Sequence, residues 1–246
     1  MPPLLEVALN GARTPAEHPG VPRTPDQLAE HSRAAVKAGA GVVHLHVYDA
    51  EGRETMAADP CAAALRAVGA ACPGIPISLT TSAAIEPDPQ ARFDLIAGWT
   101  VLPELVTVNQ GEEGIRELCD HLIARGVGIE AGLLSLADAQ RFARSGLAAR
   151  CVRVLIEPLE ADPEEAADHA AAMEEVVVRA GISLEQVHHG DGIASWAVSA
   201  RGLERGHGIR TGLEDTTVLA NGRRAVDNAE LVRAAGALIS RHYRPV

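Results

Sequence analysis

Two histidines separated by a single residue, His44 and His46, lie in the apolar stretch GVVHLHVYDAEGR of residues 41–53. Residues two apart in an extended strand project from the same face, so the two imidazoles would lie side by side. Neutral imidazole is a common ligand of transition metals, and the spacing therefore indicates part of a metal site. The alternative is a pair of hydrogen-bonded histidines in the core.

A second polar group occurs in GIRTGLED, residues 208–215, where Arg210 precedes Glu214 and Asp215. A carboxylate from Glu214 would complete a set of two histidines and one carboxylate that leaves positions open for substrate. That composition suits catalytic Zn²⁺ first and Fe(II) second. The alternative is that Glu214 or Asp215 caps the loop that follows the strand.

The elements that must bring these residues together follow one repeating pattern, in which short β-branched runs alternate with alanine-rich amphipathic stretches. Strands are expected at 4–10, 41–47, 75–82, 105–111, 127–134, 151–158, 186–190 and 208–215. Helices are expected at 24–39, 59–72, near 88–98, at 113–126, 135–146, 162–181, near 193–205 and at 227–242. The first helix has a capping box of Thr24 and Gln27 around Pro25, and Asp59-Pro60 is expected to open the second.

Eight βα units without a linker predict an α/β protein, a (β/α)₈ TIM barrel forming a single domain over residues 1–246. An open doubly wound sheet is the alternative, but no G-x-G-x-x-G follows the first strand. Sites in such barrels lie at the carboxyl ends of the strands. His44, His46 and Glu214 are therefore expected to meet there.

Other polar residues stand at strand ends and could contact a substrate. They are Thr80, Thr107, Asn109, Glu130, Glu157, His188 and His189. Hydroxyls and amides suit a substrate carboxylate or carbonyl, although they are also common where strands enter loops. His188 and His189 are adjacent, so at most one of them can face the site.

Composition limits the classes of partner. A formal net charge of −11 argues against nucleic-acid binding, and apolar residues, 47% of the chain, form no run long enough to cross a membrane. The start of the sequence does not resemble a signal peptide, and the four cysteines have no C-x-x-C spacing. We therefore expect a cytoplasmic protein with reduced, mostly buried thiols.

The H-x-H strand and the R-x-x-x-E-D strand, in eight units that open with ALNGAR, together resemble the beta-keto acid cleavage enzyme family over essentially the whole chain. The resemblance implies a zinc-dependent barrel, usually a homo-oligomer, that condenses a beta-keto acid with acetyl-CoA. The products would be acetoacetate and a new CoA thioester.

The resemblance also implies roles for individual residues. It places the zinc ligands at His44, His46 and Glu214, and the catalytic pair at Arg210 and Asp215. Because an arginine is a poor base, we assign proton transfer to Asp215 and charge positioning to Arg210. Substrate-binding positions fall on Thr80, Thr107, Asn109, Arg13 and Glu130.

Four positions depart from the family pattern. Arg13 stands where a glutamate is common, and Gly132 stands where a second strand-five carboxylate is expected. These changes suggest a substrate with a neutral or anionic side chain. Tyr48 and Ile193 each stand where the family often has an arginine, which bears on the handling of CoA.

Two other functions fit parts of the pattern. A metal-dependent hydrolase on the same barrel also uses an H-x-H strand, but usually the first strand, with further histidines on strands five and six. A catalytically lapsed relative that binds metal and a small acid is the third reading, and the departures at Arg13, Tyr48 and Ile193 favour it.

Overall fold

Eight parallel strands close into a barrel in chain order, as the repeating pattern predicts. The computed structural model describes residues 2–243. The strands are β1 (Leu5–Ala8), β2 (Val42–Leu45), β3 (Ile77–Thr80), β4 (Leu105–Asn109), β5 (Gly128–Leu133), β6 (Arg153–Ile156), β7 (Glu185–His188) and β8 (Gly208–Thr211). The fold class, a (β/α)₈ TIM barrel, is confirmed.

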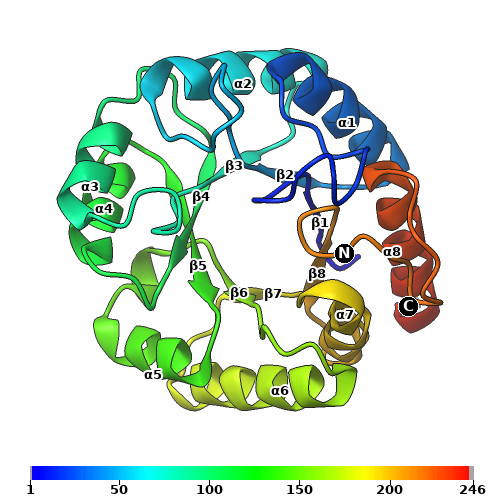
Figure 1. The fold of residues 1–246 in the computed structure, drawn as a ribbon. Helices are drawn as coiled ribbons and strands as arrows, with labels where there is room; N and C mark the ends of the chain where they lie inside the picture. Colours follow the sequence, from blue (N-terminus) through cyan, green and yellow to red (C-terminus); the bar gives the residue numbers. More distant parts are fainter. Residues whose placement is uncertain (1, 244–246) are drawn as a thin grey trace.

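A helix follows each strand and packs outside the barrel (Figure 1). The helices are α1 (Pro25–Ala38), α2 (Ala58–Ala71), α3 (Pro89–Ala97), α4 (Ile115–Ala124), α5 (Leu136–Ser145), α6 (Pro163–Arg179), α7 (Ser195–Glu204) and α8 (Asn228–His242). Short 3₁₀ turns, η1 (Ala148–Arg150) and η2 (Gly192–Ala194), precede β6 and α7. Within residues 2–243, no helix is long and apolar enough to cross a membrane.

Local signals explain most helix starts. The capping box at Thr24 is confirmed, since its hydroxyl accepts from the Gln27 backbone and the Gln27 side chain bonds back. The prediction for α2 was wrong in detail: the helix begins at Ala58, after an Ala57 cap without a side-chain bond, and Asp59 lies inside its first turn. An acidic residue in the first turn interacts favourably with the helix dipole, so Asp59 can stabilise the start of α2 without capping it.

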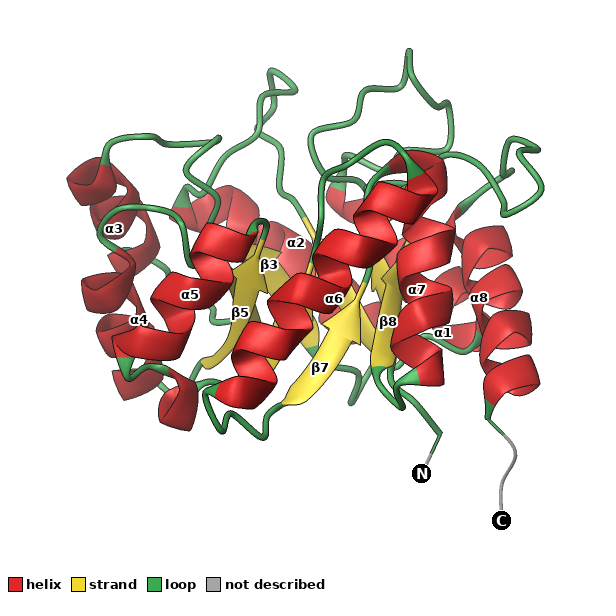
Figure 2. Cartoon of the chain, turned by 90° about the horizontal axis from the view of Figure 1, so that it is seen from below, coloured by secondary structure: helices red, strands yellow, loops and turns green. Residues whose placement is uncertain are grey.

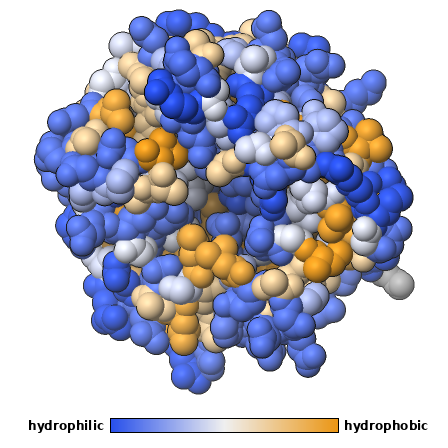
Figure 3. Space-filling view, in the orientation of Figure 1, coloured by the Kyte–Doolittle hydropathy of each residue, from blue (hydrophilic) through white to orange (hydrophobic). Residues whose placement is uncertain are grey.

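The longer loops lie at the carboxyl ends of the strands, and the C-terminal end of α8 lies on the opposite side (Figure 2). The side at the carboxyl ends of the strands is the one on which the site residues were expected. In the space-filling view it is mostly hydrophilic and hollowed near its centre, with an apolar patch beside the hollow (Figure 3).

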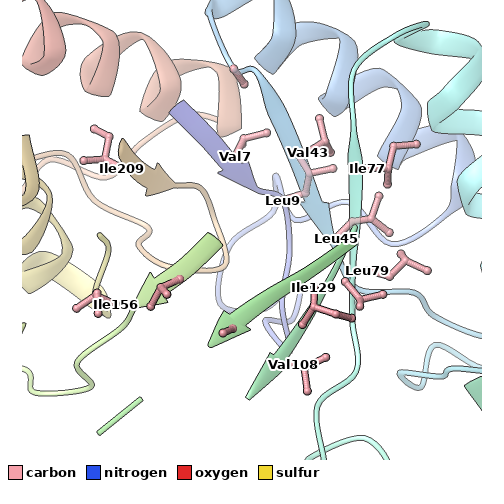
Figure 4. Close-up of a cluster of buried hydrophobic side chains, with 14 of the residues drawn as sticks. Val7, Leu9, Val43, Leu45, Ile77, Leu79, Val108, Ile129, Ile156 and Ile209 are labelled. Atoms are coloured by element: carbon pink, nitrogen blue, oxygen red, sulfur yellow. The ribbon is translucent and has the colours of Figure 1, made fainter. Parts of the chain in front are cut away.

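The apolar core lies between the strands and the helices. Alternate strand residues such as Val43, Leu45 and Ile129 (Figure 4) belong to the same buried cluster as Leu65 of α2 and Phe142 of α5. Side chains on a strand alternate between two faces, so the intervening residues project into the barrel. His44, between Val43 and Leu45, is one of these inward residues.

The barrel interior is polar, which the sequence pattern did not predict. Its buried polar residues include Glu6, Ser78, Thr107, Glu130, Arg153 and Arg210. Arg153 Nη1 lies 3.1 Å from Glu130 and 3.7 Å from Glu6. Burial raises the pKa of Glu6 well above its ordinary value. Opposite charges from different strands therefore meet inside the barrel, which reduces the cost of burying them.

A second buried charge cluster stabilises the contact between α6 and α7. The Glu174 carboxylate on α6 lies 2.7 Å from Arg201, 3.0 Å from Arg205 and 3.2 Å from His207. Burial alone would raise the pKa of Glu174, but these hydrogen bonds outweigh burial and lower it to about 2. A carboxyl with a lowered pKa stabilises the fold above its unfolded pKa, and the effect is lost as the pH falls toward 2.

We therefore expect Glu174→Gln to lower the free energy of unfolding at pH 7 by about 1–3 kcal/mol, because Arg201, Arg205 and His207 lose a charged acceptor. Urea unfolding at pH 7 and pH 3 should show the difference from wild type shrinking at the lower pH. Glu175→Gln, at an exposed ion pair with Arg179, is the control and should change little. A pH-independent loss in Glu174→Gln would contradict the charge argument.

Candidate metal centre and active site

His44, His46 and Glu214 form a three-residue cluster at the mouth of the barrel. The Nε2 atoms of both histidines lie 3.6 Å from Glu214 Oε1. The other carboxylate oxygen, Glu214 Oε2, is buried and has no hydrogen-bond partner. Two imidazole nitrogens that converge on a carboxylate with an unpartnered oxygen fit the donor set of a zinc site.

The Nδ1 side of each imidazole has its own partner. His46 Nδ1 lies 2.6 Å from Glu54 Oε1, and His44 Nδ1 lies 3.3 Å from both Ser78 Oγ and Thr107 Oγ1. Such outer partners orient metal-binding histidines and make them better ligands. Glu54 was not predicted, although the Asp49-x-x-Gly52 turn that folds it back beside β2 is visible in the sequence.

The surroundings of the three side chains hold them in different protonation states. Burial lowers the pKa of His44 to about 3, so its imidazole is neutral. Burial acts in the same direction on His46, but Glu214 and Glu54 outweigh it and raise the pKa of His46 to about 9. For Glu214, burial is outweighed by His46, His44 and Arg210, so its pKa lies well below the ordinary value and it stays an anion.

Two glycines allow Glu214 to reach the histidines. A Cβ on Gly212 would lie 1.9 Å from the Ala8 carbonyl oxygen, so the chain after β8 can pass this close to β1 only with glycine there. A Cβ on Gly11, which has φ +53°, would lie 2.5 Å from Glu214 Cγ. Close backbone approach is the property that glycine supplies at both positions.

Arg210 and Asp215 form a buried pair next to this cluster. Arg210 Nη2 donates to Asp215 Oδ1 at 2.7 Å and to Glu214 Oε1 at 3.2 Å. Burial would raise the pKa of Asp215, but Arg210 and His189 outweigh it and lower it. Asp215 is therefore a carboxylate, and the pKa of Arg210 lies well above its ordinary value. Of the two, only Asp215 can accept a proton.

His189 is the histidine of the adjacent pair that enters this site. Its Nδ1 lies 3.5 Å from Asp215 Oδ1, and its Nε2 lies 3.5 Å from Glu157 Oε2. His188 points the other way, and its ring stacks on His207 with centroids 4.8 Å apart. The expectation that at most one of the two faces the site is confirmed. Burial raises the pKa of Glu157, which lies at the mouth of the barrel.

Two further groups have metal-ligand composition. Glu6, His44 and Glu130 lie inside the barrel, where Arg153 Nη1 already lies 3.7 Å from Glu6 and 3.1 Å from Glu130. The other group is Glu174 with His188 and His207. Arg201 and Arg205 already bind its only carboxylate. Two guanidinium groups at that distance oppose a divalent cation, so this group does not compete as a metal site.

The sequence profile of the family described as beta-keto acid cleavage enzyme matches residues 2–246. The chain belongs to this family. The resemblance carried by the H-x-H and R-x-x-x-E-D strands is therefore confirmed.

Two relatives are described as 3-keto-5-aminohexanoate cleavage enzymes. The one from Fusobacterium nucleatum subsp. nucleatum is 24% identical, over 93% of this chain and 88% of the relative. The one from Acetoanaerobium sticklandii is also 24% identical, over 99% of this chain and 93% of the relative. The two alignments therefore cover nearly the whole length of this chain and of each relative.

Solved structures of ObcA share the fold. The apo structure has a TM-score of 0.71 at 20% identity, covering 91% of this chain and 62% of that chain. A ternary complex of ObcA with a C4-CoA adduct and oxalate has a TM-score of 0.72 at 20% identity, covering 91% and 64%. This chain therefore spans less than two thirds of the length of ObcA.

The predicted substrate residues of this beta-keto acid cleavage enzyme lie in two places. Thr107 and Glu130 are buried below His44, where they bond to Ser78 and to each other. Thr80 and Asn109 lie nearer the strand ends: the Thr80 hydroxyl accepts from the Ser82 backbone, and Asn109 donates to Glu112.

Three positions that depart from the family pattern have structural roles here. Arg13 donates from Nε to the Glu214 carbonyl at 2.9 Å and from Nη2 to Asp191 at 3.1 Å. Tyr48 donates to the Gly11 carbonyl, and its ring lies 4.1 Å below the Arg23 guanidinium. Arg13 and Tyr48 thus tie the loop after β1 to its neighbours. At Gly132, a Cβ would lie 2.5 Å from Asn109 Oδ1, so Asn109 fills the space of a strand-five carboxylate.

We expect Gly11→Ala to weaken metal binding at the His44–His46–Glu214 cluster by about tenfold or more, because the new methyl would displace Glu214 from the two histidines. Zinc affinity can be measured by competition with a chelator. Gly146→Ala is a matched control, since Gly146 also has a positive φ, +73°, but has open space at the Cβ position. Equal affinities in the two variants would contradict this role of Gly11.

Proposed function

We propose that this enzyme uses zinc to condense a beta-keto acid with acetyl-CoA, giving acetoacetate and a new acyl-CoA. The observation that carries the proposal is the His44–His46–Glu214 cluster beside the buried Arg210–Asp215 pair. In this proposal His44, His46 and Glu214 hold Zn²⁺. When bound there, zinc supplies a positive charge that stabilises the enolate of the substrate.

The chain's own residues move the proton. Asp215 accepts the proton from the substrate carbon between the two carbonyls, and Arg210 holds the carboxylate in place through Nη2 at 2.7 Å. The resulting carbanion attacks the thioester carbonyl and releases the CoA thiolate. The thiolate then attacks the former keto carbon, the carbon–carbon bond breaks, and Asp215 returns the proton to the acetoacetate carbanion.

Of the predicted substrate positions, we assign substrate binding to Thr80, Asn109 and Arg13, because Thr107 and Glu130 lie buried below His44 and bond to each other. The Thr80 hydroxyl supports this assignment most directly, because its backbone contact uses only the oxygen as an acceptor and leaves the proton free to donate. The Asn109 side chain at Gly132 and the arginine at position 13 replace carboxylates that would hold an amine. We therefore propose a substrate with a neutral or anionic side chain.

A panel of beta-keto acids, assayed with zinc-loaded protein in the presence and absence of acetyl-CoA, tests the proposal. Formation of acetoacetate that requires acetyl-CoA supports it. Hydrolysis of an ester or amide without acetyl-CoA would instead identify a hydrolase, and binding of keto acids without either reaction would identify a lapsed enzyme.

A further inference from the structure

Three buried side chains below His44 form a connected set of hydrogen bonds. Ser78 on β3 and Thr107 on β4 each lie 3.3 Å from His44 Nδ1 through their hydroxyl oxygens. Both hydroxyls also donate to the same oxygen of Glu130 on β5, Oε2, with Thr107 at 3.4 Å. The other oxygen, Oε1, accepts from Arg153 Nη1 at 3.1 Å.

The hydroxyl contacts to Glu130 set the state of His44, since they take both hydroxyl protons although Ser78 Oγ and Thr107 Oγ1 also lie 3.5 Å apart. Each hydroxyl has one proton, and a carboxylate can only accept. Because Ser78 and Thr107 both give their protons to Glu130, their oxygens can only accept from His44. His44 Nδ1 must then carry its proton, which leaves the lone pair on Nε2, the atom that faces Glu214 at 3.6 Å.

We propose that Glu130, acting through Ser78 and Thr107, selects the tautomer of His44 that can bind a metal. Glu130 is thus a positioning residue for the metal centre, in place of the substrate contact that the family resemblance implies. This inference rests on the zinc site of the proposed function, but it concerns the protein's own hydrogen bonds and is measurable without turnover.

The Glu130→Gln substitution should reverse which ring nitrogen of His44 carries the proton. Arg153 can only donate, so the amide oxygen of the new side chain must face Arg153. The amide NH₂ then faces Ser78 and Thr107, whose oxygens accept from it, and their protons turn toward His44 Nδ1. His44 would carry its proton on Nε2, where it blocks metal binding.

His46 provides an internal comparison, because Glu54 contacts its Nδ1 directly at 2.6 Å. In Glu54→Gln the amide oxygen can still accept from Nδ1–H, so the proton on Nδ1 of His46 is retained. The structure therefore predicts a larger effect on zinc binding for Glu130→Gln than for Glu54→Gln, although Glu54 is nearer to its histidine.

The test combines ¹⁵N NMR of the His44 ring, recorded without added zinc, with zinc affinity measured by chelator competition. Wild type should show the Nδ1–H tautomer. Glu130→Gln should show Nε2–H and a zinc Kd raised by about 10–100-fold. Glu54→Gln should raise the Kd less. Ser199→Ala, at a buried hydroxyl on α7 away from the site, should match wild type.

The Ser78→Ala/Thr107→Val double variant keeps the Glu130–Arg153 pair and tests the inference even if Glu130→Gln fails to fold. It should lose the preference for Nδ1–H and bind zinc more weakly. Retention of the Nδ1–H tautomer in either folded variant would overturn the inference, as would an unchanged zinc Kd. If wild type shows Nδ1–H but binds no zinc, the proposed function fails while the tautomer assignment stands.

Discussion

Asp215→Asn is expected to lower kcat by about 10²–10⁴-fold, because an amide of the same shape cannot accept the substrate proton. The asparagine side chain still offers Arg210 an acceptor oxygen, so the fold and the zinc content should be retained. Steady-state kinetics with the active keto acid, together with metal analysis of the purified protein, measures both. Exchange of the substrate's C2 protons with D₂O should fall in parallel with kcat.

Asp120→Asn is the matched control. Asp120 is a half-exposed carboxylate that pairs with Arg150, and its loss should leave kcat unchanged. If Asp215→Asn retained kcat within a few-fold of wild type, the base would be another group. Glu157 is the nearest alternative, since burial raises its pKa and His189 links it to Asp215.

Removing either histidine of the metal cluster is expected to abolish stoichiometric zinc and reduce acetoacetate formation to background. His44→Ala and His46→Ala each delete one of three protein ligands, and two ligands rarely retain a catalytic zinc. Metal content after dialysis and the acetyl-CoA-dependent rate are the two readouts. His169→Ala, on α6 at a partly exposed ion pair with Glu160, should keep both properties. One zinc per chain in His44→Ala or His46→Ala would rule out this site.

The sequence was sufficient for the barrel and for the convergence of His44, His46 and Glu214 at its mouth. Eight βα units predict the order of the elements, and a spacing of two places His44 and His46 on one strand face. The first residues of the helices were predicted less accurately. At α2 the Asp59-Pro60 pair resembles a cap, but the helix begins one residue before Asp59.

What could not be predicted depends on strand register. His44 pairs with Ser78 on β3, and Thr107 on β4 pairs with Glu130 on β5. Only this alignment brings the two hydroxyls and the carboxylate below one imidazole. The same holds for Arg153 and Glu6, which come from β6 and β1 and meet inside the barrel. Each residue is visible in the sequence, but its partner lies far along the chain.

Local turns set a second limit. Glu214 contacts the histidines because Gly11 and Gly212 permit close approach of the chain. The spacing of residues along the sequence does not predict such an approach. His189 was one of two adjacent candidates, and only the direction of the strand end decides that it, and not His188, faces Asp215.

The most direct test of the central claim follows the acetyl group. Zinc-loaded protein is supplied with a neutral or anionic beta-keto acid and acetyl-CoA that carries ¹³C in both acetyl carbons. If Asp215 generates a carbanion that attacks the thioester, both labelled carbons must appear at C3 and C4 of acetoacetate, and the new acyl-CoA must carry no label. Acetoacetate without label, or consumption of the keto acid without acetyl-CoA, would contradict the account.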